Sequence, residues 1–155
     1  MKRGISFEIP NQYGQFLAEI LKPVYINDFN WFITGEESYL VVEEELGEHL
    51  FPEEIKVYNG QELDEVLKNH EYYLLFVDLK AFPKNTKSID IKTYEEFLSS
   101  DCQLCLLIVD CIYTEIYCKD LNLIEKLHVN ALKNNYGNVS YITDTNDSRT
   151  RLSCW

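Results

Sequence analysis

The sequence predicts an α/β to α+β fold: one mixed sheet with an N-terminal antiparallel hairpin and about four covering helices. Strand-like apolar segments alternate with amphipathic helical segments over residues 59–143. Two aromatic β-rich runs, 30–33 and 38–42, flank a turn that contains Gly35. The chain has 155 residues and is 46% hydrophobic, which is enough for one core. We therefore expect residues 1–155 to form a single globular domain.

The first elements are a strand and a helix. Residues 4–9 alternate loosely between apolar and polar side chains, as a strand does, and Pro10 interrupts the pattern. Asn11 is a suitable helix cap, and Pro23 ends the helix. Its apolar stripe has helical spacing and consists of Tyr13, Phe16, Leu17, Ile20 and Leu21. We expect this stripe to face the core.

The next segment is the predicted hairpin, in which residues 34–37 form the turn between the two aromatic runs. Residues 43–54, which include Gly47 and Pro52, are expected to form a loop or a short helix. A short strand is expected over 55–58.

The second half is predicted to contain strand–helix–strand units. Asn59, Thr93 and Asp120 each begin a helix, the first two with a glutamate three residues later, and Gly137 is placed to end the longest helix. Residues 72–79, 104–109 and 139–143 are expected to be strands, parallel to one another with right-handed crossovers. Residues 111–118 either extend the strand 104–109 or fold back beside it, because no Gly or Pro marks a turn there.

Charge is the most distinctive global feature. The formal net charge is −12, and residues 36–65 contribute −10 of it through eleven acids and one base. This balance argues against a nucleic-acid partner, because phosphate backbones are bound by clustered Lys and Arg. It suits a basic protein partner. The alternative is a solvated surface that keeps the protein soluble.

Aromatic residues adjoin the acidic segment. Neighbouring residues of a strand point to opposite faces, so at least one aromatic side chain of a pair such as Trp31-Phe32 is expected at the surface, unless both are packed in the core. The predicted binding face combines these aromatic side chains with the carboxylates: Trp31, Tyr39, Glu43, Glu44, Glu45 and Glu48. This face supports a non-enzymatic protein-interaction module, immunity-like or regulatory.

The competing hypothesis is a small Mg-dependent hydrolase. Asp78, Asp110 and Asp144 each stand at the end of an expected strand, and in parallel neighbours their carboxylates converge on a magnesium site. Arg149 and Arg151, with Asp147, would then add an anion clamp or a base. The alternative is that these aspartates simply end strands or cap the next element.

Other chemistry lacks support in the sequence. There is no Gly-rich phosphate loop, dinucleotide fingerprint or Gly-x-Ser-x-Gly, so no cofactor is expected and a non-enzymatic role is favoured. Cys102-x-x-Cys105 has no second pair for zinc and is read as buried structural thiols. No apolar run is long enough for a membrane span and no secretion signal begins the chain, so the five cysteines indicate the reducing cytoplasm. A small-ligand sensor with an aromatic pocket stays open as a third possibility.

Two segments carry a resemblance to a known family. The first is residues 3–11, Arg-Gly-Ile-Ser-Phe-Glu-Ile-Pro-Asn. The second is residues 141–144, Tyr-Ile-Thr-Asp, with the Arg149-Thr150-Arg151 that follows. Together they resemble an uncharacterised family of small Bacillus-type proteins with a domain of unknown function. The resemblance implies a cytoplasmic bacterial protein matched over its whole length. It implies no activity, so no functional residue follows from it. The acidic, aromatic-rich character is also similar to that of bacterial immunity proteins, which neutralise toxins.

Overall fold

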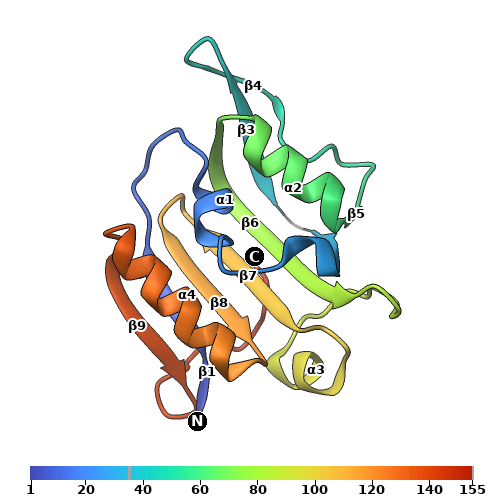
Figure 1. Cartoon of the computed structure of the whole chain (residues 1–155), viewed down its shortest axis with the longest axis vertical. Helices are drawn as coiled ribbons and strands as arrows, with labels where there is room; N and C mark the ends of the chain where they lie inside the picture. The colour runs from blue at the N-terminus through green and yellow to red at the C-terminus, as the bar shows by residue number, and fades with distance from the viewer. Residues whose placement is uncertain (35, 155) are drawn as a thin grey trace.

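The computed structural model describes residues 1–34 and 36–154, and these form an α+β fold with nine strands and four α-helices (Figure 1). The strands are β1 (Lys2–Glu8), β2 (Phe29–Ile33), β3 (Glu37–Val42), β4 (Glu45–His49), β5 (Val57–Asn59), β6 (Tyr72–Pro83), β7 (Leu104–Val109), β8 (Tyr113–Cys118) and β9 (Gly137–Thr143). The helices are α1 (Phe16–Ile20), α2 (Gly60–Asn69), α3 (Tyr94–Ser99) and α4 (Leu121–Lys133), with a 3-10 turn η1 (Ile26–Asp28). None of these helices is long and apolar enough to cross a bilayer.

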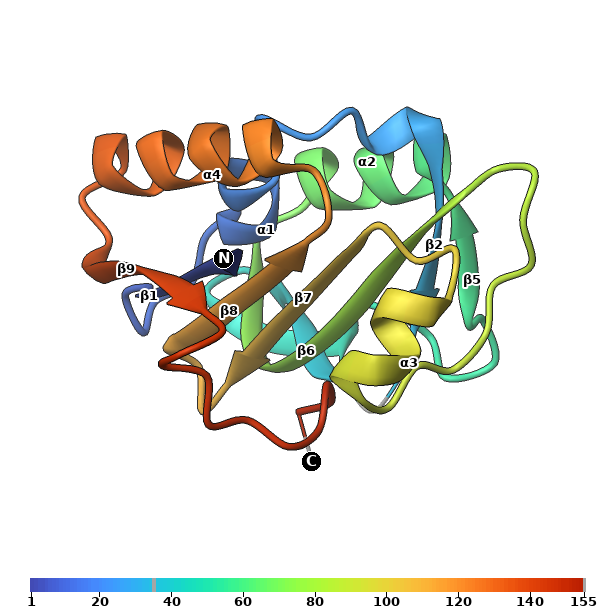
Figure 2. The ribbon, with the colours of Figure 1, turned by 90° about the horizontal axis from the view of Figure 1, so that it is seen from below.

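The strands form one sheet in the order β4-β3-β6-β7-β8-β1-β9, and β2 joins it through β6 and carries β5. Every pairing between the described strands is antiparallel, so the prediction of a mixed sheet with parallel neighbours is wrong. The apolar runs in β6 and β7 misled that prediction. They are buried on both faces because α1, α2 and α4 cover one face of the sheet, and α3 and the C-terminal segment cover the other (Figure 2).

The predicted hairpin of residues 30–33 and 38–42 is also wrong, although both strands exist. Both β2 and β3 pair with the same edge of β6: Ile33 lies opposite Leu79, and Glu37 lies opposite Phe76. Strand β6 has twelve residues, which is long enough to hold the two strands end to end. Gly35 of the predicted turn lies outside the described residues.

The actual hairpin is formed by β3 and β4, where a loop or short helix is predicted. Val42 lies opposite Glu45, so Glu43 and Glu44 are the two turn residues, with φ of 51° and 66°. Positive φ at both positions is the arrangement of a type I′ turn, which usually contains Asn-Gly. Because neither residue is Asn or Gly, nothing in the sequence marks the turn.

A second unmarked turn settles the path of residues 111–118. Asp110 and Cys111 have φ of 53° and 68°, and Val109 lies opposite Tyr113. The chain therefore folds back as β8 beside β7.

The predicted helix starts at Asn59, Thr93 and Asp120 are confirmed. The side chains of these residues accept hydrogen bonds from backbone N–H groups of Glu62 (2.9 Å), Glu96 (3.1 Å) and Leu123 (3.2 Å), respectively. The first helix is shorter than predicted, because Gly14 forms two backbone hydrogen bonds with Tyr72 and so belongs to a β-bridge. After α4 the left-handed residue is Asn135, with φ of 59°, and Gly137 begins β9.

The core has two parts, one on each face of the sheet. The larger part lies under α1, α2 and α4 and contains residues such as Ile5, Leu17, Leu67, Leu79 and Leu127. The smaller part lies under α3 and the C-terminal segment, and consists of Phe82, Ile91, Phe97, Cys102, Cys105, Leu107, Tyr117, Ile142 and Leu152.

Candidate functional site

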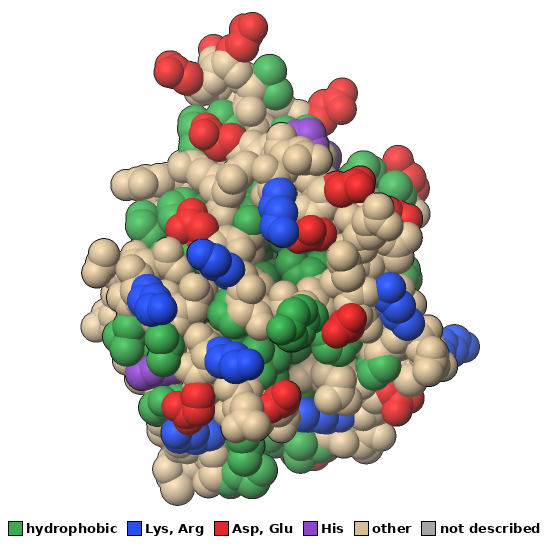
Figure 3. Space-filling view, viewed as in Figure 1, with side chains coloured by type: hydrophobic (Ala, Val, Ile, Leu, Met, Phe, Trp, Pro, Cys, Tyr) green, Lys and Arg blue, Asp and Glu red, His purple; other side chains and the backbone are tan. Residues whose placement is uncertain are grey.

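The β3–β4 hairpin extends beyond the helical layer at one edge of the sheet, and acidic side chains gather at its end (Figures 1 and 3). We call residues 42–49 the acidic arm; all eight are exposed. It carries Glu43, Glu44, Glu45 and Glu48, four of the six residues predicted as a binding face. None of these four carboxylates forms an ion pair or a hydrogen bond with any residue that the structure describes. Their charges are therefore available to a partner.

The acidic arm also has an apolar component. Val42 is 59% exposed and Leu46 is 47% exposed. Tyr39 stands at its base, where its hydroxyl donates to Glu37 Oε1 (2.7 Å) and its ring centroid lies 5.0 Å from that of His49. The arm thus presents carboxylates together with one exposed aliphatic side chain on each face of the hairpin.

Trp31, by contrast, does not belong to this surface. Its side chain is 0% exposed within the larger core, and its Nε1 donates to the carbonyl of Ile26 (3.1 Å). Strand alternation leaves Phe32 on the opposite face, where it packs partly buried against the smaller core. Both members of this aromatic pair are used in packing because both faces of the sheet are covered.

The structure does not bring the three strand-end aspartates together. Asp78 lies in the middle of β6 and is buried, whereas Asp110 is exposed in the β7–β8 turn. Asp144 follows β9, where it binds Arg3 Nε (2.8 Å) and the N-terminal ammonium group (3.3 Å). The antiparallel order makes β7 and β9 run in opposite directions, so Asp110 and Asp144 lie at opposite ends of the sheet. Among the described residues, no group of three His, Cys, Asp or Glu side chains is arranged to hold a metal ion.

Asp78 instead has a partner that sequence reasoning missed. Lys80, two residues along the same face of β6, is 0% exposed and its Nζ lies 2.5 Å from Asp78 Oδ1. Burial raises the pKa of the Asp78 carboxyl, and the Lys80 ammonium group opposes this shift. Two opposite charges at i and i+2 within an apolar run are the sequence signal of such a pair. The arrangement is a structural ion pair with no access to solvent.

Polar residues near the end of the chain form a network on the second face of the sheet. The Tyr117 hydroxyl donates to Asp147 (3.0 Å), which also accepts from Arg3 (3.1 Å). Arg149 pairs with Glu115 (3.0 Å) and donates to the carbonyl of Ser153 (2.8 Å). Asp147 and Arg149, predicted as part of a catalytic set, therefore have intramolecular partners.

This network fixes the segment that closes the smaller core. Leu152 is 1% exposed and its N–H donates to the Lys92 carbonyl (2.9 Å), while Cys154 is 7% exposed. Arg151 is exposed. The C-terminal segment is thus part of the packing.

Comparison with known proteins gives the family. Residues 2–153 match the family described as Protein of unknown function (DUF2691). The chain belongs to the DUF2691 family. It is 48% identical over 153 residues, 99% of each chain, to a relative described as Uncharacterized protein YncE from Bacillus subtilis (strain 168). No solved structure matches.

Membership of DUF2691 confirms the resemblance expected from residues 3–11 and 141–151, which lie in β1 and in β9 with the segment after it. In the fold these segments are neighbours, since β1 pairs with β9 and Arg3 binds Asp144 and Asp147. The family has no assigned activity, so any function has to be inferred from the surfaces of the molecule.

Glu36 lies in a cavity of about 320 Å³ beside Thr34, Phe51 and Lys56 in this DUF2691 chain. Burial raises the pKa of its carboxyl to about 7. Its Oε2 atom is shielded from solvent and has no hydrogen-bond partner within the described residues. The carboxylate form of Glu36 is therefore unfavourable in the fold.

Glu36→Gln is expected to stabilise the DUF2691 chain by about 1–2 kcal/mol near pH 8, a value reduced for partial solvent screening, and to change little near pH 4. The carboxyl has a folded pKa of about 7, above its value of about 4.3 in an unfolded chain. Its contribution to stability is complete below the unfolded pKa and is lost as the pH rises through the folded pKa. Urea unfolding across this pH range measures the effect, with exposed Glu48→Gln as the control. Parallel pH profiles for wild type and Glu36→Gln would contradict it.

Proposed function

We propose that this protein is a non-enzymatic interaction module of the reducing cytoplasm, and that its acidic arm binds a basic protein. The observation that carries the proposal is the set of four exposed, unpaired carboxylates on a projecting hairpin, next to exposed Val42 and Leu46. Carboxylates free of internal partners accelerate and orient the approach of a basic surface. Val42 and Leu46 lie on opposite faces of the hairpin, so each face has one exposed aliphatic side chain for apolar contact with a partner.

The backbone of the turn supports the same proposal. Glu43 and Glu44 occupy left-handed positions that cost non-glycine residues roughly 1–2 kcal/mol each. Asn-Gly would form this turn at lower cost. Strain of this kind is typical of functional sites, where a side chain is needed for binding.

The alternative, a small Mg-dependent hydrolase, depends on convergence of Asp78, Asp110 and Asp144. Their separation along the sheet removes the geometric support for that alternative. The free state of all five cysteines supports the reducing compartment in the proposal. A regulatory role and an immunity-like role, in which the partner is a basic toxin, are both consistent with an acidic arm.

The test is capture of a partner from a Bacillus subtilis lysate at low salt, by the tagged wild-type protein and by a variant in which all four arm glutamates become Gln. A matched control carries Gln at four exposed glutamates elsewhere: Glu54, Glu65, Glu71 and Glu95. We expect wild type and control to retain one basic protein in a stoichiometric complex, and the arm variant to bind the purified partner at least about tenfold more weakly. A partner that binds the arm variant as tightly as wild type, or whose binding does not weaken when its exposed Lys and Arg residues are changed to Gln, contradicts the proposal.

A further inference from the structure

A basic groove lies on the helical side of the molecule, far from the acidic arm. Its volume is about 440 Å³, and it runs between α4 and the segment that follows α1. Lys22, Lys126 and Lys133 line it together with Pro23 and Val129. Val129 is 48% exposed. We call this groove, lined by these residues, the lysine groove. Basic side chains are prominent on this face of the molecule (Figure 3).

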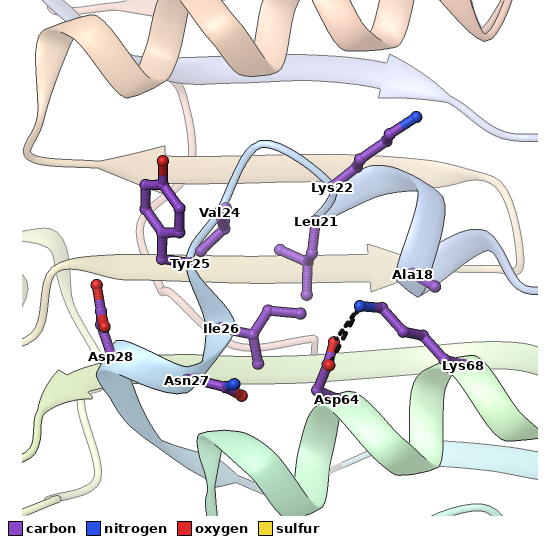
Figure 4. Close-up of a pocket in the computed structure, with 10 residues that line it drawn as sticks. All are labelled: Ala18, Leu21, Lys22, Val24, Tyr25, Ile26, Asn27, Asp28, Asp64 and Lys68. Carbon is purple, nitrogen blue, oxygen red and sulfur yellow. Dashed lines mark hydrogen bonds and ion pairs between the residues drawn. The ribbon is translucent and has the colours of Figure 1, made fainter.

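The positive charge of the lysine groove is not neutralised from within. None of its three lysines forms an ion pair with a described residue. Figure 4 shows Lys22 extending away from Asp64, which is paired with Lys68 at 3.0 Å. Glu125 at the rim is already bound to Lys2 Nζ (2.5 Å). A chain with a net charge of −12 thus keeps three unpaired lysines around one apolar depression.

The walls of the groove are fixed in the folded protein. Asn130, on the lining, donates from Nδ2 to the carbonyl of Glu19 at 2.8 Å, which ties α4 to α1. A preformed site needs little ordering on binding, and this lowers the entropic cost of receiving a ligand.

The acidic arm and the lysine groove lie toward opposite edges of the sheet, that is, toward opposite ends of the strand order. Helix α4 packs on β1, β8 and β9, whereas β4 is the strand at the other end. Strands β3, β6 and β7 intervene, and neighbouring strands are about 4.8 Å apart, so the arm does not reach the groove of its own molecule. Contact between the two surfaces requires a second copy.

We propose that the lysine groove receives the acidic arm of a second copy of this chain. The inference rests on the proposed function, because it names the basic surface that the arm binds, the lysine groove, on a second copy of a chain that is acidic overall. Carboxylates on the arm meet the three lysines in the groove, and Val42, which shares a face of the hairpin with Glu45, meets Val129 and Pro23. The contact is head-to-tail, so each molecule keeps one free arm and one free groove, and the assembly grows into chains or closes into a ring.

A hairpin in a shallow groove buries less than the roughly 1,200 Å² of a standard interface, so the association is weak and sensitive to salt. In sedimentation velocity at about 300 μM protein and about 25 mM salt, we expect a weight-average mass above that of the 18.3 kDa monomer. At about 0.5 M salt the association constant is expected to fall at least about tenfold.

A mixing experiment locates the contact. The arm variant has Gln at all four arm glutamates, and the groove variant has Gln at its three lysines, so each lacks one surface and is expected to stay monomeric. Mixed together they form a 1:1 complex and nothing larger, because only the arm of one and the groove of the other are intact. Two control variants should associate like wild type. One has Gln at Lys84, Lys87 and Lys92, and the other is the four-glutamate control described above.

The outcomes separate this inference from the proposed function. A wild-type chain that is monomeric at both salt concentrations overturns self-association, and the arm's binding to another basic protein is judged by the capture experiment alone. Association that survives in the groove variant but not in the arm variant overturns the groove as the docking place. Association of both variants at wild-type strength overturns the contact entirely.

Discussion

Lys80→Met is expected to destabilise the fold by about 3–5 kcal/mol, the cost of leaving a buried charge without its partner. Lys80 and Asp78 are almost completely buried between the sheet and its second-face cover, with Nζ 2.5 Å from Oδ1. The loss is expected to shrink as the pH falls. Without the ammonium group the pKa of Asp78 rises further, and protonation then removes the unpaired charge.

Urea denaturation of Lys80→Met and of the double variant Asp78→Leu/Lys80→Met measures this effect. The double variant should recover most of the loss, because an apolar pair of similar size removes both desolvation penalties. Lys84→Met, at an exposed position after β6, is the control and should change stability by less than about 0.5 kcal/mol. Equal destabilisation of the single and double variants would show that shape, and not charge, dominates here.

Gly4→Ala is expected to cost about 3 kcal/mol or more, or to prevent folding, because a close backbone approach leaves no room for a side chain. A Cβ atom at Gly4 would lie 1.8 Å from the carbonyl oxygen of Ile116 in β8. Gly4 pairs with both β8 and β9, so neither neighbour can withdraw without breaking the sheet.

Thermal and urea unfolding of Gly4→Ala measure this loss, with Gly47→Ala as the matched control. A Cβ atom at Gly47 would meet its nearest neighbour at 3.4 Å, so the control should unfold like wild type within about 0.5 kcal/mol. A Gly4→Ala protein as stable as wild type would show that β1 can shift relative to β8.

The features that the sequence predicted well are local. Asn59 and Thr93 begin helices because each side chain accepts a hydrogen bond from the backbone N–H three residues later. The buried runs in β6 and β7 were also recognisable from a local pattern. A short continuous run of apolar side chains is typical of a strand that is covered on both faces.

Strand direction could not be predicted, because an apolar run indicates that both faces are covered and does not indicate whether its neighbours run parallel or antiparallel to it. The cover here is α3 and the C-terminal segment, the latter held by Arg149 through contacts with Glu115 and Ser153. No periodicity in β6 or β7 records this. The turns at Glu43-Glu44 and Asp110-Cys111 also escaped prediction, because their positive φ angles occur without glycine.

The candidate site was predicted in part. The acidic residues of the arm follow from composition, since a run of glutamates is rarely buried. Trp31 was misplaced because its burial depends on a carbonyl partner, Ile26, in a 3-10 turn that the sequence does not signal. The lysine groove was missed because Lys22 is about a hundred residues from Lys126 and Lys133, and only packing of α4 against α1 brings them together.

The position of β1 between β8 and β9 has a consequence for biosynthesis. During synthesis, strand β1 acquires its first partner only after about 105 further residues, when Tyr113–Cys118 is made. At roughly 5–20 residues per second, its edges stay unpaired for about 5–20 s during synthesis. The long-range pairing of β1 with β8 and β9 places folding toward the slow end of small-protein rates. A nascent chain stalled before β8 should leave Ile5 and Phe7 exposed and available to chaperones.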